Sequence, residues 1–337
     1  MPAPLATPLS FSHRLDRRRF LRTLFCSSAA LALNVKPRRV AAAGLSGDLH
    51  LIAVGDYGSG DEKQAAVAAA MRLYVEQQKL KPEWLLMLGD NFYKSSRLGG
   101  VSPARWKAGF EEMYPQDAFP CPCPAVLGNH DYSDDAPQQL AYAKAGGTRW
   151  TLPAKWYRME LGGVATFLFI DTNLRGPSGK LPFGGAPTLF LTPEEESAQW
   201  RWLDAQLAAS RAGFTVVVGH HPVYSNGMHG DTRELVAKLA PRLEKGGVHL
   251  YLCGHDHDLQ HLEAKGSRTS FALSGGGGAR IRELKKPERT MPYGRAVHGF
   301  SHLQLNADRI LVRHVDVSGV QLHAFEKALD YSWRLAV

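Results

Sequence analysis

Five short polar motifs carry the residues whose types could do chemistry. Each motif follows an apolar run, and together they contain Asp56, Asp90, Tyr93, Asn129, His220, His255 and His257. Two carboxylates, an amide, three imidazoles and a phenol supply enough oxygen and nitrogen donors for two metal ions, with one carboxylate free to bridge them. Sulfur is absent from the set, which favours hard or borderline metals. The residue types therefore indicate a centre that binds two metal ions.

The elements that would position these residues are short strands. Near-continuous apolar runs precede the motifs at 51–54, 84–88, 125–127, 215–218 and 248–253, and a further run lies at 164–170. Such runs indicate strands that helices bury on both faces. In open α/β sheets, sites form outside the carboxyl ends of the strands, so we expect the motifs to converge on one crevice. A glycine next to each motif permits a sharp turn and a close backbone approach.

Helical patterns and a change of character near the C-terminus define the expected architecture. Helices are predicted over 62–78, over 192–210, which opens with the capping signature Thr-Pro-Glu-Glu-Glu, and over 231–244. Short, closely spaced runs at 271–273, 299–305, 310–317 and 320–325 are typical of antiparallel strands. We expect an α/β fold of two packed, mixed β-sheets flanked by helices, formed by one domain over residues 44–337.

Residues 1–43 have the charge and pattern of an export leader. They hold eight basic residues and one acid, so they carry seven units of the formal net charge of +8. The segment Asp16-Arg17-Arg18-Arg19-Phe20-Leu21-Arg22 precedes an apolar stretch too short to span a membrane, and Ala41-Ala42-Ala43 ends it. This segment resembles the bacterial twin-arginine signal. It predicts cleavage after Ala43, the twin-arginine translocase as a partner during export, and a periplasmic or secreted protein. The alternatives are a basic disordered tail and an amphipathic surface helix.

The rest of the chain is nearly neutral and of ordinary composition. With 44% hydrophobic and 21% charged residues in the whole chain, extensive disorder is excluded. Because the body has no polybasic character, we expect no nucleic-acid partner. We also expect the protein to have no stable membrane anchor and to be a monomer.

The motifs also resemble those of a known family. Asp56-x-Gly58, Gly89-Asp90-x-x-Tyr93, Gly128-Asn129-His130-Asp131, Val217-x-x-His220 and Gly254-His255-x-His257 are similar to the five blocks of the calcineurin-like metallophosphoesterases. A tyrosine three residues after the second aspartate is typical of the purple acid phosphatases. The flanking residues resemble the small, tartrate-resistant animal form more than the large plant form. The similarity extends from about His50 to Phe325.

The resemblance implies a ligand for each metal position. The first metal would be held by Asp56, Asp90, Tyr93 and His257, and the second by Asp90, Asn129, His220 and His255. A phenolate and carboxylates suit Fe(III), whose charge transfer from Tyr93 would colour the protein. The second position suits a divalent ion, which can be Fe(II), Zn(II) or Mn(II). Hydroxide activated by this pair of metals would attack the phosphorus of a phosphate monoester.

Three further histidines are candidate catalytic residues. The resemblance implies that His130 and His229 face the substrate, where an imidazole can bind the phosphoryl group or protonate the leaving oxygen. Two residues at or next to the candidate positions differ from the animal form. Met228 replaces an acid, and His221 replaces a tyrosine. His221 is either a third substrate-facing imidazole or a turn residue.

Three functions remain open at this point. The first is an exported acid phosphatase, a metal-dependent phosphoric monoester hydrolase acting on small phosphorylated substrates. The second is a phosphodiesterase or nucleotide pyrophosphatase that uses the same metal site. The third is an exported metal-binding protein without catalysis.

Overall fold

The computed structural model describes residues 47–93, 101–134, 136–175, 190–209, 211, 213–285 and 292–336. All of them belong to one compact unit. The leader predicted over residues 1–43 lies outside the described residues. Among the residues described, no helix combines the length and the apolar character needed to cross a membrane.

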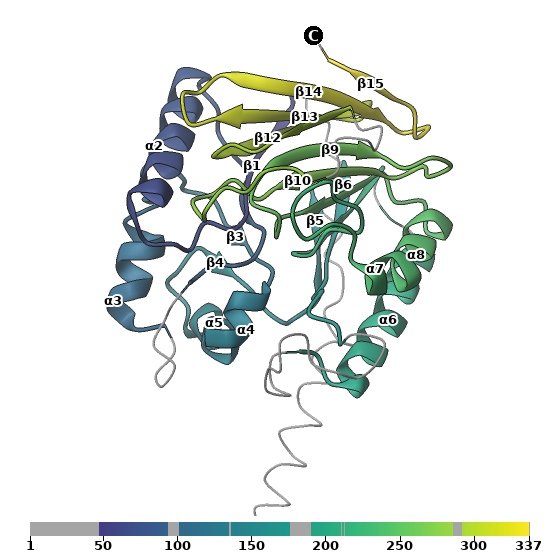
Figure 1. The fold of residues 1–337 in the computed structure, drawn as a ribbon, viewed down its shortest axis with the longest axis horizontal. Helices are drawn as coiled ribbons and strands as arrows, with labels where there is room; N and C mark the ends of the chain where they lie inside the picture. The colour runs from purple at the N-terminus through teal and green to yellow at the C-terminus, as the bar shows by residue number, and fades with distance from the viewer. Residues whose placement is uncertain are drawn as a thin grey trace, which may run out of the picture. The chain divides into compact units, whose positions relative to one another are not determined.

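Two large sheets form the centre of this unit (Figure 1). The six-stranded sheet has the order β15-β14-β13-β12-β1-β2. Its strands are β1 (Leu49–Val54), β2 (Trp84–Met87), β12 (Gly299–Leu305), β13 (Arg309–Asp316), β14 (Gln321–Ala328) and β15 (Trp333–Leu335). β1 and β2 are parallel, and the other pairs are antiparallel. The expected series of antiparallel strands near the C-terminus is thus present at 299–328.

The seven-stranded sheet has the order β11-β9-β10-β8-β7-β6-β5. Its strands are β5 (Tyr157–Leu161), β6 (Ala165–Phe169), β7 (Phe214–Val218), β8 (Leu250–Cys253), β9 (Leu259–Glu263), β10 (Ser270–Ser274) and β11 (Tyr293–Arg295). The central strands β6, β7, β8 and β10 are parallel. A short third sheet pairs β3 (Cys123–Pro124) with β4 (Trp150–Thr151).

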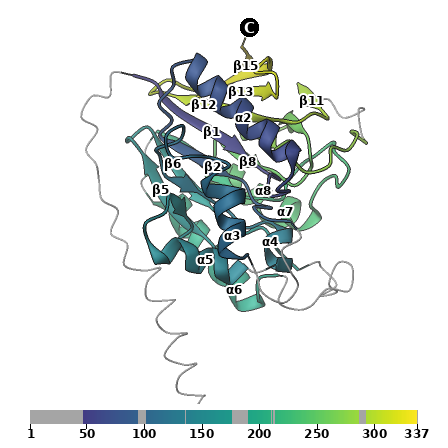
Figure 2. The same cartoon turned by 90° about the vertical axis from the view of Figure 1, so that its left-hand side faces the viewer.

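Helices lie on either side of the two sheets (Figure 1). They are α2 (Glu62–Gln77), α3 (Pro103–Trp106) with the π-helical turn η1 (Lys107–Glu111), α4 (Asn129–Asp134), α5 (Ala136–Ala145), α6 (Pro193–Ala208), α7 (Arg233–Lys238) and α8 (Ala240–Lys245). Helix α2 runs along the six-stranded sheet (Figure 2), where the rings of Tyr74 and Phe300 lie 5.4 Å apart. The fold class is therefore the expected one: two mixed sheets with helices outside them.

The apolar runs of the central strands are continuous because both faces are buried. In β7, Val216 and Val218 enter the core that contains β1 and β12, whereas Val217 enters a second core with Leu203 of α6 and Leu235 of α7. A strand buried on both faces has no position at which a polar side chain would reach water. The predicted capping box of α6 is present, since Thr192 Oγ1 accepts from the N–H of Glu195 and the Glu195 carboxylate accepts from the N–H of Thr192.

Three predicted elements are wrong in detail. The strand expected at 125–127 is the two-residue β3 at Cys123–Pro124, and Ala125 adds only one bridge to Met87. The helix expected at 231–244 is divided into α7 and α8, because Pro241 has no N–H to continue the first helix. The strand expected at 271–273 is β10, which is antiparallel to β9 but parallel to β8.

Candidate metal centre and active site

Four of the five motifs follow the ends of strands, one begins a helix, and the structure brings all five together. Asp56 follows β1, Asp90 follows β2, and His220 and His255 follow β7 and β8, whereas Asn129 is the first residue of α4. Asp56, Asp90 and His255 have φ angles of 57°, 51° and 74°. Non-glycine residues rarely adopt this left-handed conformation, and they do so most often at functional sites. The backbone thus turns sharply at three of the predicted ligands.

Two glycines permit the close approach of the loops. Gly89 has a φ of 89°, and a side chain there would collide with the ring of His220. A Cβ on Gly128 would overlap the carboxylate of Asp90. At these positions the glycine allows a ligand side chain to lie directly against the backbone of another motif.

Two buried carboxylates lie at the centre of the site. Asp56 and Asp90 are 0% and 1% exposed, and the Tyr93 hydroxyl lies 3.3 Å from Asp56 Oδ1 and 3.0 Å from Asp90 Oδ2. Burial and the charge of Asp90 raise the pKa of Asp56 well above its ordinary value. Burial also acts to raise the pKa of Asp90, but His220 and His130 lower it below its ordinary value. Burial and both carboxylates raise the pKa of Tyr93, so its ionisation requires a nearby cation.

The imidazoles present lone pairs to the same space. His220 Nδ1 lies 2.9 Å from the carbonyl oxygen of Leu88, and its Nε2 lies 3.4 Å from Asp90 Oδ1. His257 Nδ1 lies 2.7 Å from the carbonyl oxygen of Arg280, and its Nε2 lies 3.6 Å from Asp56 Oδ1. A carbonyl oxygen only accepts, so each Nδ1 carries the hydrogen and each Nε2 keeps its lone pair. This arrangement is typical of histidines that bind metal ions.

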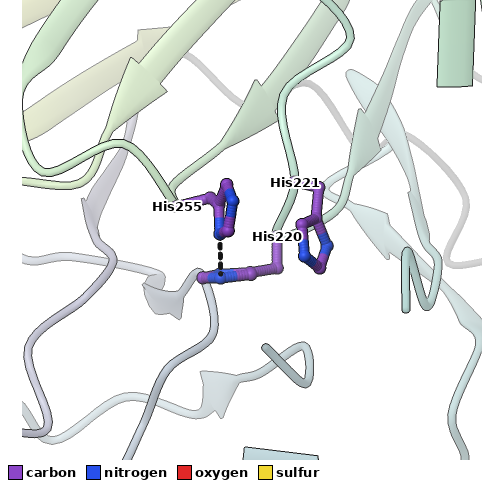
Figure 3. Close-up of side chains that lie close together, drawn as sticks. All are labelled: His220, His221 and His255. Atoms are coloured by element: carbon purple, nitrogen blue, oxygen red, sulfur yellow. Dashed lines mark hydrogen bonds between the residues drawn. The ribbon is translucent and has the colours of Figure 1, made fainter. Parts of the chain in front are cut away.

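His255 and Asn129 approach His220 from two other loops. His255 Nδ1 lies 3.3 Å from His220 Nε2 (Figure 3), and Asn129 Oδ1 also lies 3.3 Å from that nitrogen. Burial lowers the pKa of His220 and lowers that of His255 well below its ordinary value. Burial lowers the pKa of His257 to about 4. The three rings are therefore neutral, which is the form that binds metal.

Both the atom types of the donor set and the negative charge of its buried carboxylates fit metal ions. One oxygen or nitrogen from each of Asp56, Asp90 and His220 lies within 4.8 Å of the others. In the described part of the chain, neither carboxylate forms an ion pair with a lysine or arginine. Buried carboxylates without a cation are costly. Metal ions bound among these donors would supply the missing positive charge.

The three candidate catalytic histidines all lie beside this donor set. The backbone N–H of His130 donates to Asp90 Oδ1 at 2.9 Å, and its ring centre is 4.5 Å from that of Tyr93. The ring centre of His229 is 4.3 Å from that of His255. His221 lies 4.3 Å from His255 between ring centres (Figure 3).

Asp256 and Arg282 hold the ring of His229, and neither was predicted from the sequence. His229 Nδ1 lies 2.9 Å from Asp256 Oδ1, which also accepts from the backbone N–H of His229 at 2.9 Å. The guanidinium of Arg282 donates to His229 Nε2 at 2.8 Å. Asp256 had a signal in the sequence, since it lies between the predicted ligands His255 and His257. Arg282 had none, because it is far from His229 in the chain.

Roles for Asp131, which belongs to the third motif, and for Thr172 were not predicted either. Asp131 is fully buried and accepts from the backbone N–H groups of Asn91 at 2.9 Å and Gly128 at 2.7 Å, so it joins two of the motif loops. Thr172 accepts from the backbone N–H groups of His220 and His221. Asp131 stands next to a predicted catalytic residue in the sequence. Nothing near Thr172 in the sequence marks it.

Comparison with known proteins gives the same family that the motifs resemble. The profile of the family described as calcineurin-like phosphoesterase matches residues 44–259. The tartrate-resistant acid phosphatase type 5 of Oryctolagus cuniculus is 31% identical over 301 residues, which cover 83% of this chain and 91% of the relative. Purple acid phosphatase 7 of Arabidopsis thaliana is 33% identical over 297 residues, which cover 82% of this chain and 85% of the relative.

Solved structures with lower identity share the fold. GAP50, the anchor in the inner membrane complex of Plasmodium, has a TM-score of 0.70 at 22% identity and covers 82% of this chain and 88% of its own. The purple acid phosphatase PPD1 of yellow lupin seeds has a TM-score of 0.62 at 16% identity and covers 84% of this chain and 54% of its own. The family profile spans most of the described unit, and all five motifs lie within it. This chain belongs to the calcineurin-like phosphoesterase family.

Proposed function

We propose that this protein is an acid phosphatase that hydrolyses phosphate monoesters of small molecules at a pair of metal ions. One observation carries the proposal. The two oxygens of Asp90 face different donor groups, since Oδ1 lies 3.4 Å from His220 Nε2 and Oδ2 lies 3.0 Å from the Tyr93 hydroxyl. A carboxylate with one oxygen toward each of two donor sets is suited to bridge two cations.

The proposed ligand sets are those that the family resemblance implies, and the neighbours of Asp90 support them. The first ion would be held by Asp56, Asp90, Tyr93 and His257, and the second by Asp90, Asn129, His220 and His255. The phenol and carboxylates suit Fe(III), whereas the amide and imidazoles suit Fe(II), Zn(II) or Mn(II). Bound in this way, the ions would neutralise phosphate oxygens and lower the pKa of water.

The chain's own residues bind and orient the ester. His130 is fixed through its backbone by Asp90 and its ring lies against Tyr93, so it can contact a phosphoryl group bound over these residues. Asp256 holds Nδ1 of His229, so Nε2 is the nitrogen that faces the ester; it would pass a proton to the leaving oxygen only where a proton replaces the hydrogen bond that Nε2 accepts from Arg282. Arg282 adds a fixed positive charge beside that nitrogen, where the dianionic ester must approach. His221 completes the group of candidate catalytic histidines.

We further propose that residues 1–43 direct export through the twin-arginine translocase and that residues 44–337 form one mature domain, a periplasmic or secreted monomer. The pair Arg17-Arg18, followed by Phe20-Leu21, supports this proposal. Replacing both arginines of the pair by lysine should leave the protein in the cytoplasm and uncleaved, as cell fractionation would show. Processing and export at the normal rate would refute the proposal.

The enzymatic proposal is tested on exported protein with bound metal. Metal analysis and a visible spectrum identify the ions, and turnover of p-nitrophenyl phosphate is compared with that of bis(p-nitrophenyl) phosphate at acid and neutral pH. We expect two metal ions per chain and faster turnover of the monoester in acid. Faster turnover of the diester would favour a phosphodiesterase. Two bound metals without turnover of either compound would favour a metal-binding protein.

A further inference from the structure

The hydroxyl of Thr172 has three hydrogen-bond partners, all of them atoms of the His220-His221 pair. Thr172 follows β6 and is 2% exposed. Its Oγ1 lies 3.2 Å from the backbone N of His220, 2.9 Å from the backbone N of His221 and 2.8 Å from Nδ1 of the His221 ring. The side chain therefore bonds to the backbone of a predicted metal ligand and to the ring of the next residue.

Counting donors and acceptors fixes the hydrogen on the His221 ring. A threonine hydroxyl has one hydrogen and two lone pairs. The two backbone N–H groups can only donate, so they use both lone pairs of Thr172 Oγ1. The hydroxyl hydrogen must then point to Nδ1 of His221, which accepts it. The His221 ring is consequently neutral, with its own hydrogen on Nε2.

The position of this ring is fixed next to the predicted ligands. The Tyr251 hydroxyl donates to the carbonyl oxygen of His221 at 2.6 Å. The rings of His220, His221 and His255 lie together (Figure 3), and each offers a nitrogen within 4.8 Å of the others. Because Thr172 occupies Nδ1 of His221, its Nε2 is the nitrogen left for the site.

The imidazoles of His220 and His221 therefore differ in what they offer. His220 donates from Nδ1 to the carbonyl oxygen of Leu88, so its Nε2 presents a lone pair. His221 has the opposite tautomer, and its Nε2 presents a hydrogen. A nitrogen that carries a hydrogen cannot bind a metal ion, but it can donate to an oxygen atom of a bound anion.

We propose that His221 is a neutral hydrogen-bond donor to the phosphoryl group, and that Thr172 is the positioning residue that fixes its tautomer. The inference rests on the proposed phosphatase function. Donors that are oriented before the substrate arrives stabilise charge on phosphate oxygens without reorganisation.

The test compares His221→Phe with His221→Gln in metal-loaded protein. Phenylalanine keeps a ring without a donor, and glutamine restores an N–H near the position of Nε2. We expect both variants to keep the metal content of the wild type. The inhibition constant of inorganic phosphate should rise about tenfold in His221→Phe, since hydrogen bonds to charged groups have effects of this size, and His221→Gln should recover most of the loss. The kcat/KM for p-nitrophenyl phosphate should fall in the same order.

Each alternative role gives a different result. If His221 binds a metal ion, His221→Phe loses metal, which refutes the proposal. If His221 is only a turn residue, phosphate inhibition is unchanged, which also refutes it. A wild-type protein that turns over no phosphoester contradicts the proposed function instead, and calorimetric titration with phosphate still tests His221.

Variants of Thr172 test the positioning role. Thr172→Ser keeps the hydroxyl and should bind phosphate as the wild type does. Thr172→Val removes the hydroxyl, so phosphate binding should weaken, and the loss should be smaller when His221 is already phenylalanine. Thr269→Val is the matched control, because Thr269 is also buried and donates to a backbone carbonyl, that of Val248. Equal losses in Thr172→Ser and Thr172→Val would refute a role for the hydroxyl.

Discussion

The backbone N–H of His255 donates a 2.7 Å hydrogen bond to Oδ2 of Asp56. This bond connects the end of β8 in one sheet with the end of β1 in the other. Both residues have left-handed φ angles, 74° and 57°, and the bond uses one carboxylate oxygen while the other faces Tyr93. The backbone thus orients the Asp56 carboxylate within the fold itself.

Replacing Tyr93 by phenylalanine should abolish visible absorption. The Tyr93 hydroxyl lies between Asp56 and Asp90, and only its phenolate can give charge transfer to Fe(III). Spectra of metal-loaded wild type and variant, with iron content measured on the same samples, check this expectation. A band that persists in the variant would show that Tyr93 is not the source of the colour.

Replacing Asp131 by alanine should lower the free energy of unfolding by about 3 kcal/mol or more, because a buried donor left without a partner costs about 1–3 kcal/mol. Asp131 accepts from the N–H groups of Asn91, Phe92 and Gly128 and from the side chain of Gln139. Urea denaturation measures the loss. The control Asp308→Ala alters an exposed turn and should change stability by less than about 0.5 kcal/mol. Similar values for both variants would contradict the prediction.

Replacing His314 by glutamine should reduce the loss of stability in acid. Burial, with His323 and His261 nearby, lowers the pKa of His314 to about 3. The unfolded ring takes up a proton below about pH 6.5. Between pH 6.5 and about 3 the unfolded state therefore binds more protons than the folded state, and the free energy of unfolding decreases as the pH is lowered. One such ring contributes at most about 1.4 kcal/mol for each pH unit.

Denaturation of both proteins at several pH values between neutral and acid conditions checks the His314 prediction. The slope of unfolding free energy against pH should be smaller in the variant by up to one proton. Because the metal centre is the same in both proteins, its own pH dependence cancels in the comparison. Parallel slopes would show that His314 does not stay neutral in the folded protein.

Replacing Arg282 by glutamine should raise KM for phosphate monoesters about tenfold, as expected when a charged hydrogen-bond donor is lost. Arg282 lies 2.8 Å from His229 Nε2, and in the described part of the chain it has no carboxylate partner. Arg280→Gln is the matched control, since it removes the same charge from an exposed side chain two residues away. Steady-state kinetics measures both. If the control raises KM as much, the effect is general electrostatics and Arg282 has no specific role.

The sequence by itself determined the residue types of the site and the elements that carry them. Asp56, Asp90, His220 and His255 each follow an apolar strand, and this local pattern is visible because strands buried on both faces exclude polar residues until they end. The capping box at Thr192 was equally local. The prediction of a strand at 125–127 was wrong, because the position of so short an element depends on its partners, here β4 and Met87, rather than on its own residues.

Only the tertiary structure decided how the candidate catalytic histidines are held. Arg282 forms a hydrogen bond with His229, and Thr172 forms one with His221. In both pairs the residues lie in different loops that no periodicity in the sequence connects. The tautomer of His221 depends on which two N–H groups already occupy the Thr172 hydroxyl. Residue identity sets which atoms can donate or accept, but the packing of distant segments sets which of them meet, because hydrogen bonds act only over short distances and within narrow angles.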